Sequence, residues 1–161
     1  MARLRPLMKH PINMLLLLSF LFFYLSPVFA QSPDFSGTWV INKEKSKILS
    51  WPKGMTSTVF IISQKADSFQ LIIHHVFGAQ QDTLVIKLVA DGGTQKVLGI
   101  LEGKLERVKG GLHAELWKSD FSDKVTYTFG KDNNEFIADE VLASKTDNHH
   151  NIWVFDRDRS K

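Results

Sequence analysis

Hydrophobic and polar side chains alternate along most of the chain after residue 31. Residues 69–77 (FQLIIHHVF) show the pattern clearly, because every second side chain from Phe69 to Phe77 is apolar except that of His75. A period of two places successive side chains on opposite faces of a β-strand. Polar and glycine-containing turns separate these runs. The pattern predicts strands at residues 36–42, 56–64, 69–77, 83–90, 96–108 (one or two strands), 112–121, 124–129, 135–143 and 150–155.

The predicted elements are nearly all strands. No stretch after residue 31 repeats its apolar positions at the helical period for more than about three turns. A polar stretch at residues 43–54 is expected to form a short helix or a long loop. The other connections are short and sequential, and no strand–helix–strand unit is indicated. We therefore predict an all-β fold, an antiparallel up-and-down β-barrel of about nine strands, in preference to a Greek-key sandwich.

The N-terminal segment differs from the rest of the chain. A short basic stretch precedes an apolar run at residues 14–25, which is followed by residues 28–30 (VFA). This order predicts a secretory signal peptide at residues 1–30, cleaved after Ala30. A membrane anchor is the alternative, but about 12 apolar residues fall short of the roughly 20 that cross a bilayer as a helix. We therefore expect one mature domain, residues 31–161, which is exported to the periplasm or beyond and does not span the membrane.

Charge and cysteine content narrow the classes of function. Arg3, Arg5 and Lys9 lie in the predicted signal, and without these three the 20 Lys and Arg become 17, which balance 17 Asp and Glu. A neutral mature domain lacks the concentrated positive charge that nucleic-acid binding requires, so no nucleic-acid partner is expected. The chain has no cysteine, which excludes disulfides and thiolate metal sites. Export without cysteine favours a bacterial envelope protein, and we expect a monomer stabilised by its core.

A short motif opens the first predicted strand. Residues 34–46 read DFSGTWVINKEKS, and the GTW triplet within them resembles the G-x-W signature of lipocalins and the wider calycin group. With the closing residues 154–157 (VFDR), the pattern F-S-G-T-W followed by N-x-x-K-S is similar to a set of small exported bacterial lipocalin-like proteins. The resemblance covers most of the mature chain. It implies a reduced calycin barrel, without the C-terminal helix and disulfide of a lipocalin proper.

Three residues carry the structural part of this motif. Gly37 lets the backbone bend or approach closely where the first strand enters the barrel. Trp39 offers a large flat ring that can plug one end. In lipocalins an arginine just beyond the last strand lies across this tryptophan, and Arg157 occupies the corresponding place here. The resemblance therefore implies a cation–π contact between Arg157 and Trp39 that ties the two ends of the domain together.

Aromatic and aliphatic side chains on alternate strand positions indicate an apolar interior. A barrel of about eight strands either fills its interior with side chains or encloses one small ligand. An apolar cavity with a few polar groups is the usual form of a small-molecule site. Trp51, on the long loop after the first strand, is a candidate lid, or else packs on the barrel mouth. The candidate pocket residues are Trp51, Phe69, Leu71, Ile73, His75, Phe77, Tyr127, Phe129, Glu140 and Trp153, with His75, Tyr127 and Glu140 as polar anchors.

The orientation of Glu140 has two interpretations. It shares a strand face with Phe136 and Ala138, and if that face is internal the carboxyl group points into the barrel with a raised pKa. In the other arrangement Ile137 and Val141 face inward, and Glu140 lies in solvent. We favour the second arrangement.

The histidines are the candidate metal ligands. His74 and His75 are adjacent in a strand, so their side chains point to opposite faces and cannot chelate one ion. His75, His113 and His150 together would suit zinc, copper or haem iron if their strands were neighbours. Nothing in the spacing favours such a site, and we predict no metal and no cofactor.

No motif indicates catalysis. The sequence contains no G-x-S-x-G elbow, phosphate loop or dinucleotide fingerprint, so we expect no enzymatic activity. The leading hypothesis is an exported lipocalin-like barrel that binds a small hydrophobic or amphipathic ligand in its interior. The alternatives are a cell-envelope interaction module with a packed core and a histidine-based haem or metal protein.

Overall fold

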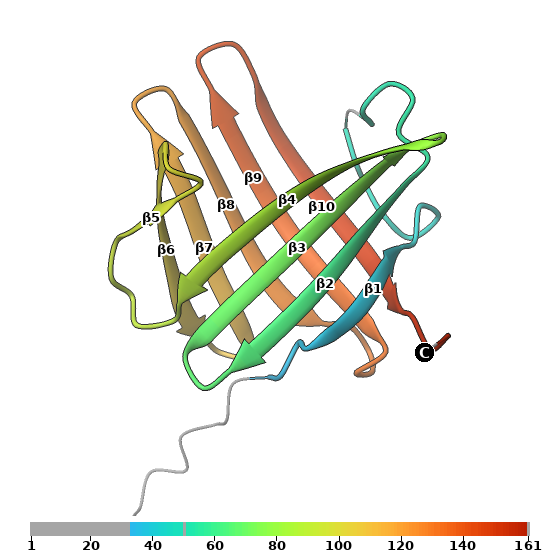
Figure 1. The fold of residues 1–161 in the computed structure, drawn as a ribbon, viewed down its shortest axis with the longest axis horizontal. Coiled ribbons are helices and arrows are strands. Elements are labelled where there is room, and N and C mark those ends of the chain that lie inside the picture. Colours follow the sequence, from blue (N-terminus) through green and yellow to red (C-terminus); the bar gives the residue numbers. More distant parts are fainter. Residues whose placement is uncertain (1–32, 50, 161) are drawn as a thin grey trace, which may run out of the picture. The chain divides into compact units, whose positions relative to one another are not determined.

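The computed structural model describes residues 33–49 and 51–160, which form ten β-strands and, within those ranges, no helix (Figure 1). Accordingly, this part of the chain has no helix with the length and hydropathy that a membrane crossing requires. The predicted signal peptide lies outside the described residues. The strands are β1 (Gly37–Ile41), β2 (Ser57–Lys65), β3 (Ser68–Phe77), β4 (Gln80–Val89), β5 (Gln95–Val97), β6 (Leu101–Val108), β7 (Gly111–Lys118), β8 (Phe121–Phe129), β9 (Glu135–Ser144) and β10 (Asn148–Arg157).

The strands form a single antiparallel meander. Their spatial order is β4-β3-β2-β1-β10-β9-β8-β7-β6-β5. The first strand pairs with the second and with the last, which places Trp39 opposite Arg157 and joins the two ends of the domain. The predicted all-β, up-and-down barrel is confirmed, with ten strands against the about nine expected from the alternation.

The sheet nearly closes into a barrel. Closure is incomplete because β4 and β5, its two edge strands, share no ladder. Side chains bridge this seam. Gln95 accepts a hydrogen bond from the backbone N–H of Val89 and donates one to its carbonyl, both at 2.8 Å. Gly103 keeps the seam compact, since a β-carbon there would lie 2.9 Å from Leu116 Cδ2 and 3.1 Å from Leu88 Cδ2. An amide side chain thus satisfies edge backbone groups that would otherwise lack partners.

Aromatic rings fill one end of the barrel, which we name the aromatic end (Phe35, Trp39, Phe129 and Phe136). Phe35, Trp39 and Phe136 are fully buried. The ring centroid of Phe35 lies 4.7 Å from that of Phe129 and 5.4 Å from that of Phe136. The indole N–H of Trp39 donates to the Phe35 carbonyl at 2.9 Å, so its one polar group is satisfied. This end of the barrel is a packed core.

Arg157 covers the aromatic end. Its guanidinium carbon lies 4.1 Å from the centroid of the Trp39 ring, which confirms the predicted cation–π contact. Its Nη1 also donates to the Ser36 carbonyl at 3.0 Å. Gly37 has a φ of +142°, and a β-carbon there would lie 2.6 Å from Arg157 Nη1. Gly37 therefore leaves the space in which the guanidinium reaches Trp39.

Residues 42–49 and 51–56 form a loop with turns, which is the second of the two alternatives considered for this stretch. Two other stretches differ from the prediction made from the sequence. Residues 122–123, expected in a turn, lie inside β8, and the turn falls at residues 119–120. Residues 80–81, also expected in a turn, begin β4. Serine, aspartate and glutamine resemble turn residues in composition, but here the ladder to the neighbouring strand continues through them.

Candidate functional site

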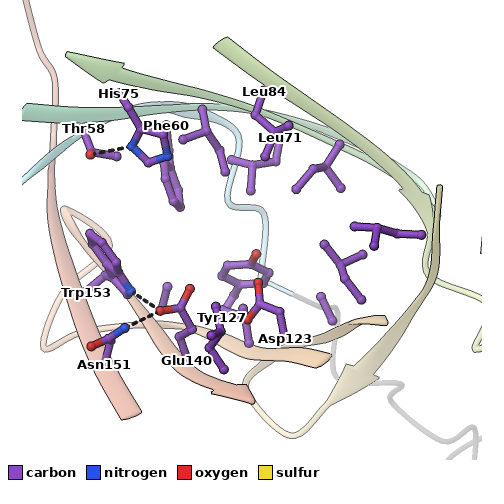
Figure 2. Close-up of a pocket in the computed structure, with 18 of the residues that line it drawn as sticks. Thr58, Phe60, Leu71, His75, Leu84, Asp123, Tyr127, Glu140, Asn151 and Trp153 are labelled. Atoms are coloured by element: carbon purple, nitrogen blue, oxygen red, sulfur yellow. Dashed lines mark hydrogen bonds between the residues drawn. The ribbon is translucent and has the colours of Figure 1, made fainter. Parts of the chain in front are cut away.

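The barrel encloses a cavity of about 430 Å³ (Figure 2). Side chains on both sides of the gap between β4 and β5 line the cavity, and most of the lining side chains are aliphatic or aromatic. The volume lies in the range of small-molecule sites. A hollow interior removes the premise of the alternative in which the barrel has a packed core. Representative apolar lining residues are Leu71, Ile73, Leu84, Ile86 and Val125.

Polar side chains gather at the end of the cavity opposite the aromatic end. Asp123 on β8 pairs with Leu142 on β9, and Leu142 pairs with His149 on β10. These positions lie at the ends of the three strands that are farthest from Phe129. One pair deeper, Glu140 lies beside Asn151. We name this group of polar lining residues (His75, Asp123, Glu140, His149 and Asn151) the polar end. The strand alternation brings it together, because all five occupy inward positions of their strands.

Glu140 points into the cavity, so the favoured expectation that it faces solvent is wrong. The face that it shares with fully buried Phe136 is internal, whereas Val141 is 47% exposed. Its Oε2 accepts hydrogen bonds from Asn151 Nδ2 at 2.7 Å and from Trp153 Nε1 at 2.9 Å (Figure 2). Burial of the large Phe136 ring sets the orientation of β9, and Glu140 follows from the period of two.

Asp123 is the second carboxyl group of the cavity. The sequence suggests it, with Asp120, as a possible carboxylate pair, but it was not among the candidate pocket residues. Its Oδ1 is buried and accepts no hydrogen bond from the described residues. Burial, together with the negative charge of Glu140, raises the pKa of Asp123 to about 7. The signal was present in the sequence, since apolar residues on both sides share its strand face: Phe121, Val125, Tyr127 and Phe129.

His75 and Tyr127 approach the cavity from opposite walls (Figure 2). The His75 ring shares a hydrogen bond with Thr58 Oγ1 at 3.0 Å. Burial lowers the pKa of His75, against the opposing charges of Asp82 and Glu140, so the imidazole is mainly neutral at neutral pH. Burial raises the pKa of the Tyr127 phenol, and the nearby carboxylates raise it further, so the phenol keeps its proton. Both groups are therefore neutral hydrogen-bonding groups.

The loop between β1 and β2 contributes to the mouth of the cavity through Pro52. Trp51 beside it is not a lining residue, and its ring centroid lies 6.0 Å from that of Trp153. The Trp51 indole N–H donates to the Met55 carbonyl, and Lys43 Nζ lies 4.7 Å from the centroid of the ring. Trp51 thus packs on the barrel mouth, the second of the two roles considered for it.

Seven of the ten candidate pocket residues line the cavity, and three lie elsewhere. Trp51 is the loop residue just described. Phe129 packs in the aromatic end against Phe35 and Trp39. Phe77 is half-buried at the last position of β3. Strand alternation places Phe77 and Phe129 on the inward face, but the cavity does not extend to either strand end. The seven are Phe69, Leu71, Ile73, His75, Tyr127, Glu140 and Trp153.

The three histidines considered for a metal site do not converge. His75 faces the cavity, whereas His113 bonds to Thr126 Oγ1 at 3.0 Å and His150 bonds to Asp139 Oδ1 at 2.9 Å. His113 and His150 occupy strand positions that alternate with lining residues, so they face outward. Across residues 33–49 and 51–160, no three His, Asp or Glu side chains are placed to hold a metal ion. Within that part of the chain, the metal alternative has no geometric support.

Comparison with known proteins identifies the fold. No protein-family model matches the chain, and neither does any curated protein at a significant level. The solved structure of the REP1-NXSQ fatty acid transporter is similar over 80% of this chain and 98% of its own, with 11% identity and a TM-score of 0.57. A point mutant of the fluorescent protein UnaG covers 78% of this chain and 97% of its own, with 17% identity and a TM-score of 0.53.

A third solved structure has the same arrangement. The zebrafish ileal bile acid-binding protein, complexed with cholic acid, is similar over 77% of this chain and 98% of its own. The identity is 10%, and the TM-score is 0.51. At identities this low the likeness concerns the fold alone. The chain therefore has the fold of the calycin-like β-barrels.

Proposed function

We propose that this protein is an exported carrier that binds a small hydrophobic or amphipathic molecule inside its barrel. The observation that carries the proposal is the mainly apolar cavity of about 430 Å³ inside the barrel. Burying apolar ligand surface in it would contribute about 25 cal/mol per Å² of area removed from water. His75, Tyr127 and Glu140 line the cavity as polar groups that could orient the ligand.

The structural neighbours support binding in preference to catalysis. One of them is described as a fatty acid transporter, and another is a bile acid-binding protein with cholic acid bound. Both kinds of molecule combine a large apolar body with a polar group. A cavity with apolar walls and one polar end suits molecules of that general design. We accordingly propose a binding role without enzymatic activity.

Export is proposed from residues 1–30, whose basic start, apolar run and small-residue end match a secretory signal. The test is to produce the full-length chain in a bacterium with a C-terminal tag and to determine the N-terminus of the product. A periplasmic or secreted product that begins at Gln31 would support export. A cytoplasmic product that retains residues 1–30 would contradict it.

Ligand binding is tested on the same tagged protein, recovered under gentle conditions. Native mass spectrometry should show an added mass that is lost on denaturation, or the protein should bind the neutral apolar dye Nile red with a blue-shifted emission. Either result supports a carrier. Absence of both an added mass and dye binding would contradict it.

A matched pair of variants on β9 locates the binding. Ala138 is 2% exposed and lines the cavity, whereas Val141 is 47% exposed on the outer face. Ala138→Phe places a ring in the cavity and should weaken dye binding by about tenfold or more, since buried contact area is lost. Val141→Phe introduces the same ring outside and should leave the affinity unchanged. Equal affinities in two folded variants would place the ligand outside the barrel.

A further inference from the structure

We propose that the cavity selects amphiphiles whose polar group is a protonated amine over amphiphiles whose polar group is a carboxylate. This inference rests on the carrier function proposed above and adds the charge of the ligand. It follows from the side chains that line the cavity: which charges they bring, which of their atoms lack partners, and where they stand relative to the apolar wall.

The charges of the lining are acidic. Asp123 and Glu140 both line the cavity, and no Lys or Arg is among the described residues that do. Lys43 lies at the mouth, but its Nζ is placed over the Trp51 ring outside the lining. A carboxylate ligand would add a third acid to a site in which the basic side chains among the described lining residues are the imidazoles of His75 and His149, and the His149 ring already bonds to Asp147 at 2.6 Å. A further negative charge is costly away from water. An ammonium group would instead offset part of this negative charge.

Some hydrogen-bonding atoms of the polar end have no partner among the described residues. Asp123 Oδ1 and His149 Nδ1 are buried and have no hydrogen-bond partner among the described residues. Both hydrogen bonds to Glu140 reach Oε2, from Asn151 and Trp153, and none of the described residues donates to Oε1. A primary ammonium group supplies three donors, whereas a carboxylate supplies only acceptors. The vacant oxygens of Asp123 and Glu140 match the amine.

The positions of the two carboxyl groups allow one ammonium group to reach both. In the β8–β9 register Asp123 pairs with Leu142, and Glu140 pairs with Val125, so the two acids are diagonal neighbours on one face. Such positions are roughly 7–8 Å apart along the sheet, which leaves room for a nitrogen between the side chains. Figure 2 shows both acids on the same wall, beside Tyr127. The aromatic rings of Tyr127 and Trp153 line the same region and favour a cation near their faces.

The apolar part of the ligand has a matching place. From the polar end the cavity continues along Ile73, Leu71 and Phe69 on β3 toward the aromatic end. An alkyl chain or ring system directed this way would lie against apolar side chains while its nitrogen stays between the acids. An ammonium group also promotes ionisation of Asp123, whose pKa of about 7 leaves it about half protonated at neutral pH. Binding and charging of Asp123 therefore favour each other.

The experiment compares decylamine, decanol and decanoate, which share one straight chain and differ in charge. Each compound is used below its own critical micelle concentration to displace Nile red at about pH 7.5. The protein is the tagged product obtained from the full-length chain. Decylamine should bind tighter than decanoate by about tenfold or more, as expected for charge-assisted hydrogen bonds made by only one of them. Decanol should lie between the two.

Variants tie the preference to the two acids. Asp123→Asn and Glu140→Gln keep the side-chain shapes and remove the charges, and each should reduce the ratio of decylamine to decanoate affinity at least about threefold. Asp139→Asn on the outer face of β9, where Asp139 bonds to His150, should leave the ratio unchanged. If one cavity variant fails to fold, the other still tests the assignment.

The outcomes separate the inference from the carrier function. Decanoate or decanol binding as tightly as decylamine would overturn the amine preference and leave the carrier function standing. A preference for decylamine that survives in both cavity variants would also overturn the inference, because residues other than Asp123 and Glu140 would then recognise the charge of the ligand. Failure of all three compounds and of the dye to bind would contradict the carrier function itself.

Discussion

The two ends of the barrel belong to the same strands but are filled differently. At the aromatic end, Phe35, Trp39 and Phe136 are fully buried and their rings touch. At the polar end, the same inward faces carry Asp123 and Glu140 beside a cavity of about 430 Å³. Large rings meet across the barrel axis and exclude a ligand, whereas shorter side chains leave space. The comparison indicates that one end stabilises the fold and the other binds.

A single strand makes the same division visible. On β9 the inward side chains run from Phe136 through Ala138 to Glu140. The ring packs in the aromatic end, the methyl group of Ala138 leaves room, and the carboxylate stands in the polar end. A span of five residues on β9 therefore leads from the packed core to the site. The predictions below test whether stability and binding really separate in this way.

The largest expected effect is on the aromatic end. Trp39→Ala should lower the free energy of unfolding by about 3–5 kcal/mol, because a fully buried ring leaves a void among packed neighbours. Leu71→Ala should cost less, since its side chain faces an existing cavity and loses fewer contacts. Urea unfolding of both variants measures the difference. An equal or greater loss for Leu71→Ala would contradict the division into core and site.

The next effect concerns the polar end and depends on pH. The ordinary pKa of an aspartate is 3.8, and that of Asp123 in the folded protein is about 7. Between these values the unfolded chain has released the proton while the native protein still holds it, so stability falls as pH rises. Asp123→Asn removes this loss. It should raise the free energy of unfolding by about 1–4 kcal/mol at pH 8 and by much less at pH 4.

Urea unfolding at the two pH values measures the effect of Asp123→Asn. Asp139→Asn, on the outer face, is the control and should show no such pH-dependent gain. The prediction fails if the gain from Asp123→Asn is the same at pH 4 and at pH 8. That result would mean that the side chain is hydrated in the native protein.

A smaller effect is expected on ligand affinity. Decylamine should bind up to about tenfold tighter at pH 8 than at pH 6, because Asp123 changes from mostly protonated to mostly ionised over this interval. The other titratable groups that line the cavity are His75, Tyr127, Glu140 and His149. Dye displacement at both pH values measures the change. Asp123→Asn should flatten the pH profile, and a profile unchanged in that variant would assign the titration to one of the other four.

The smallest effect is at the contact between the chain ends. Arg157→Lys keeps the charge but loses the flat guanidinium over Trp39, and should cost about 0.5–1 kcal/mol. Arg107→Lys is a matched control, since Arg107 pairs with Asp67 at 2.6 Å on the surface and should contribute less. Thermal unfolding and the near-ultraviolet signal of Trp39 report the two changes. A control that costs more than Arg157→Lys would show that the cation–π contact has little weight.

Much of the barrel could be read from the sequence because strand alternation is a local property. In the run from Phe69 to Phe77, the alternation of side chains within nine residues is enough to assign the two faces of the strand, and the composition of the turns marks its ends. The contact between Trp39 and Arg157 was predicted from the resemblance of the GTW motif and the closing VFDR to lipocalin-like proteins. Export stays a prediction, because residues 1–30 lie outside the described part of the chain.

The candidate site was harder to predict, because either face of a strand can be the internal one when both faces carry apolar residues. On β9 both faces carry apolar residues, so the orientation of Glu140 was misjudged from the strand alone. Asp123 was left out of the candidate pocket because Ser122-Asp123 has the composition of a turn, although the ladder to β7 and β9 continues through both residues. Each error concerns a polar residue inside the barrel, where burial is decided by the partners of the strand.

The sequence by itself determined that the chain forms short antiparallel strands and that Trp39 lies where the two ends of the domain meet. Both features follow from local patterns, the period of two and the motif residues. The tertiary structure alone decided which face of each strand is internal and that the interior is hollow. Those properties depend on the sizes of side chains from strands far apart in the sequence, such as Phe136 meeting Phe35 at one end. They also depend on Asp123 and Glu140 being brought onto one wall by pairing.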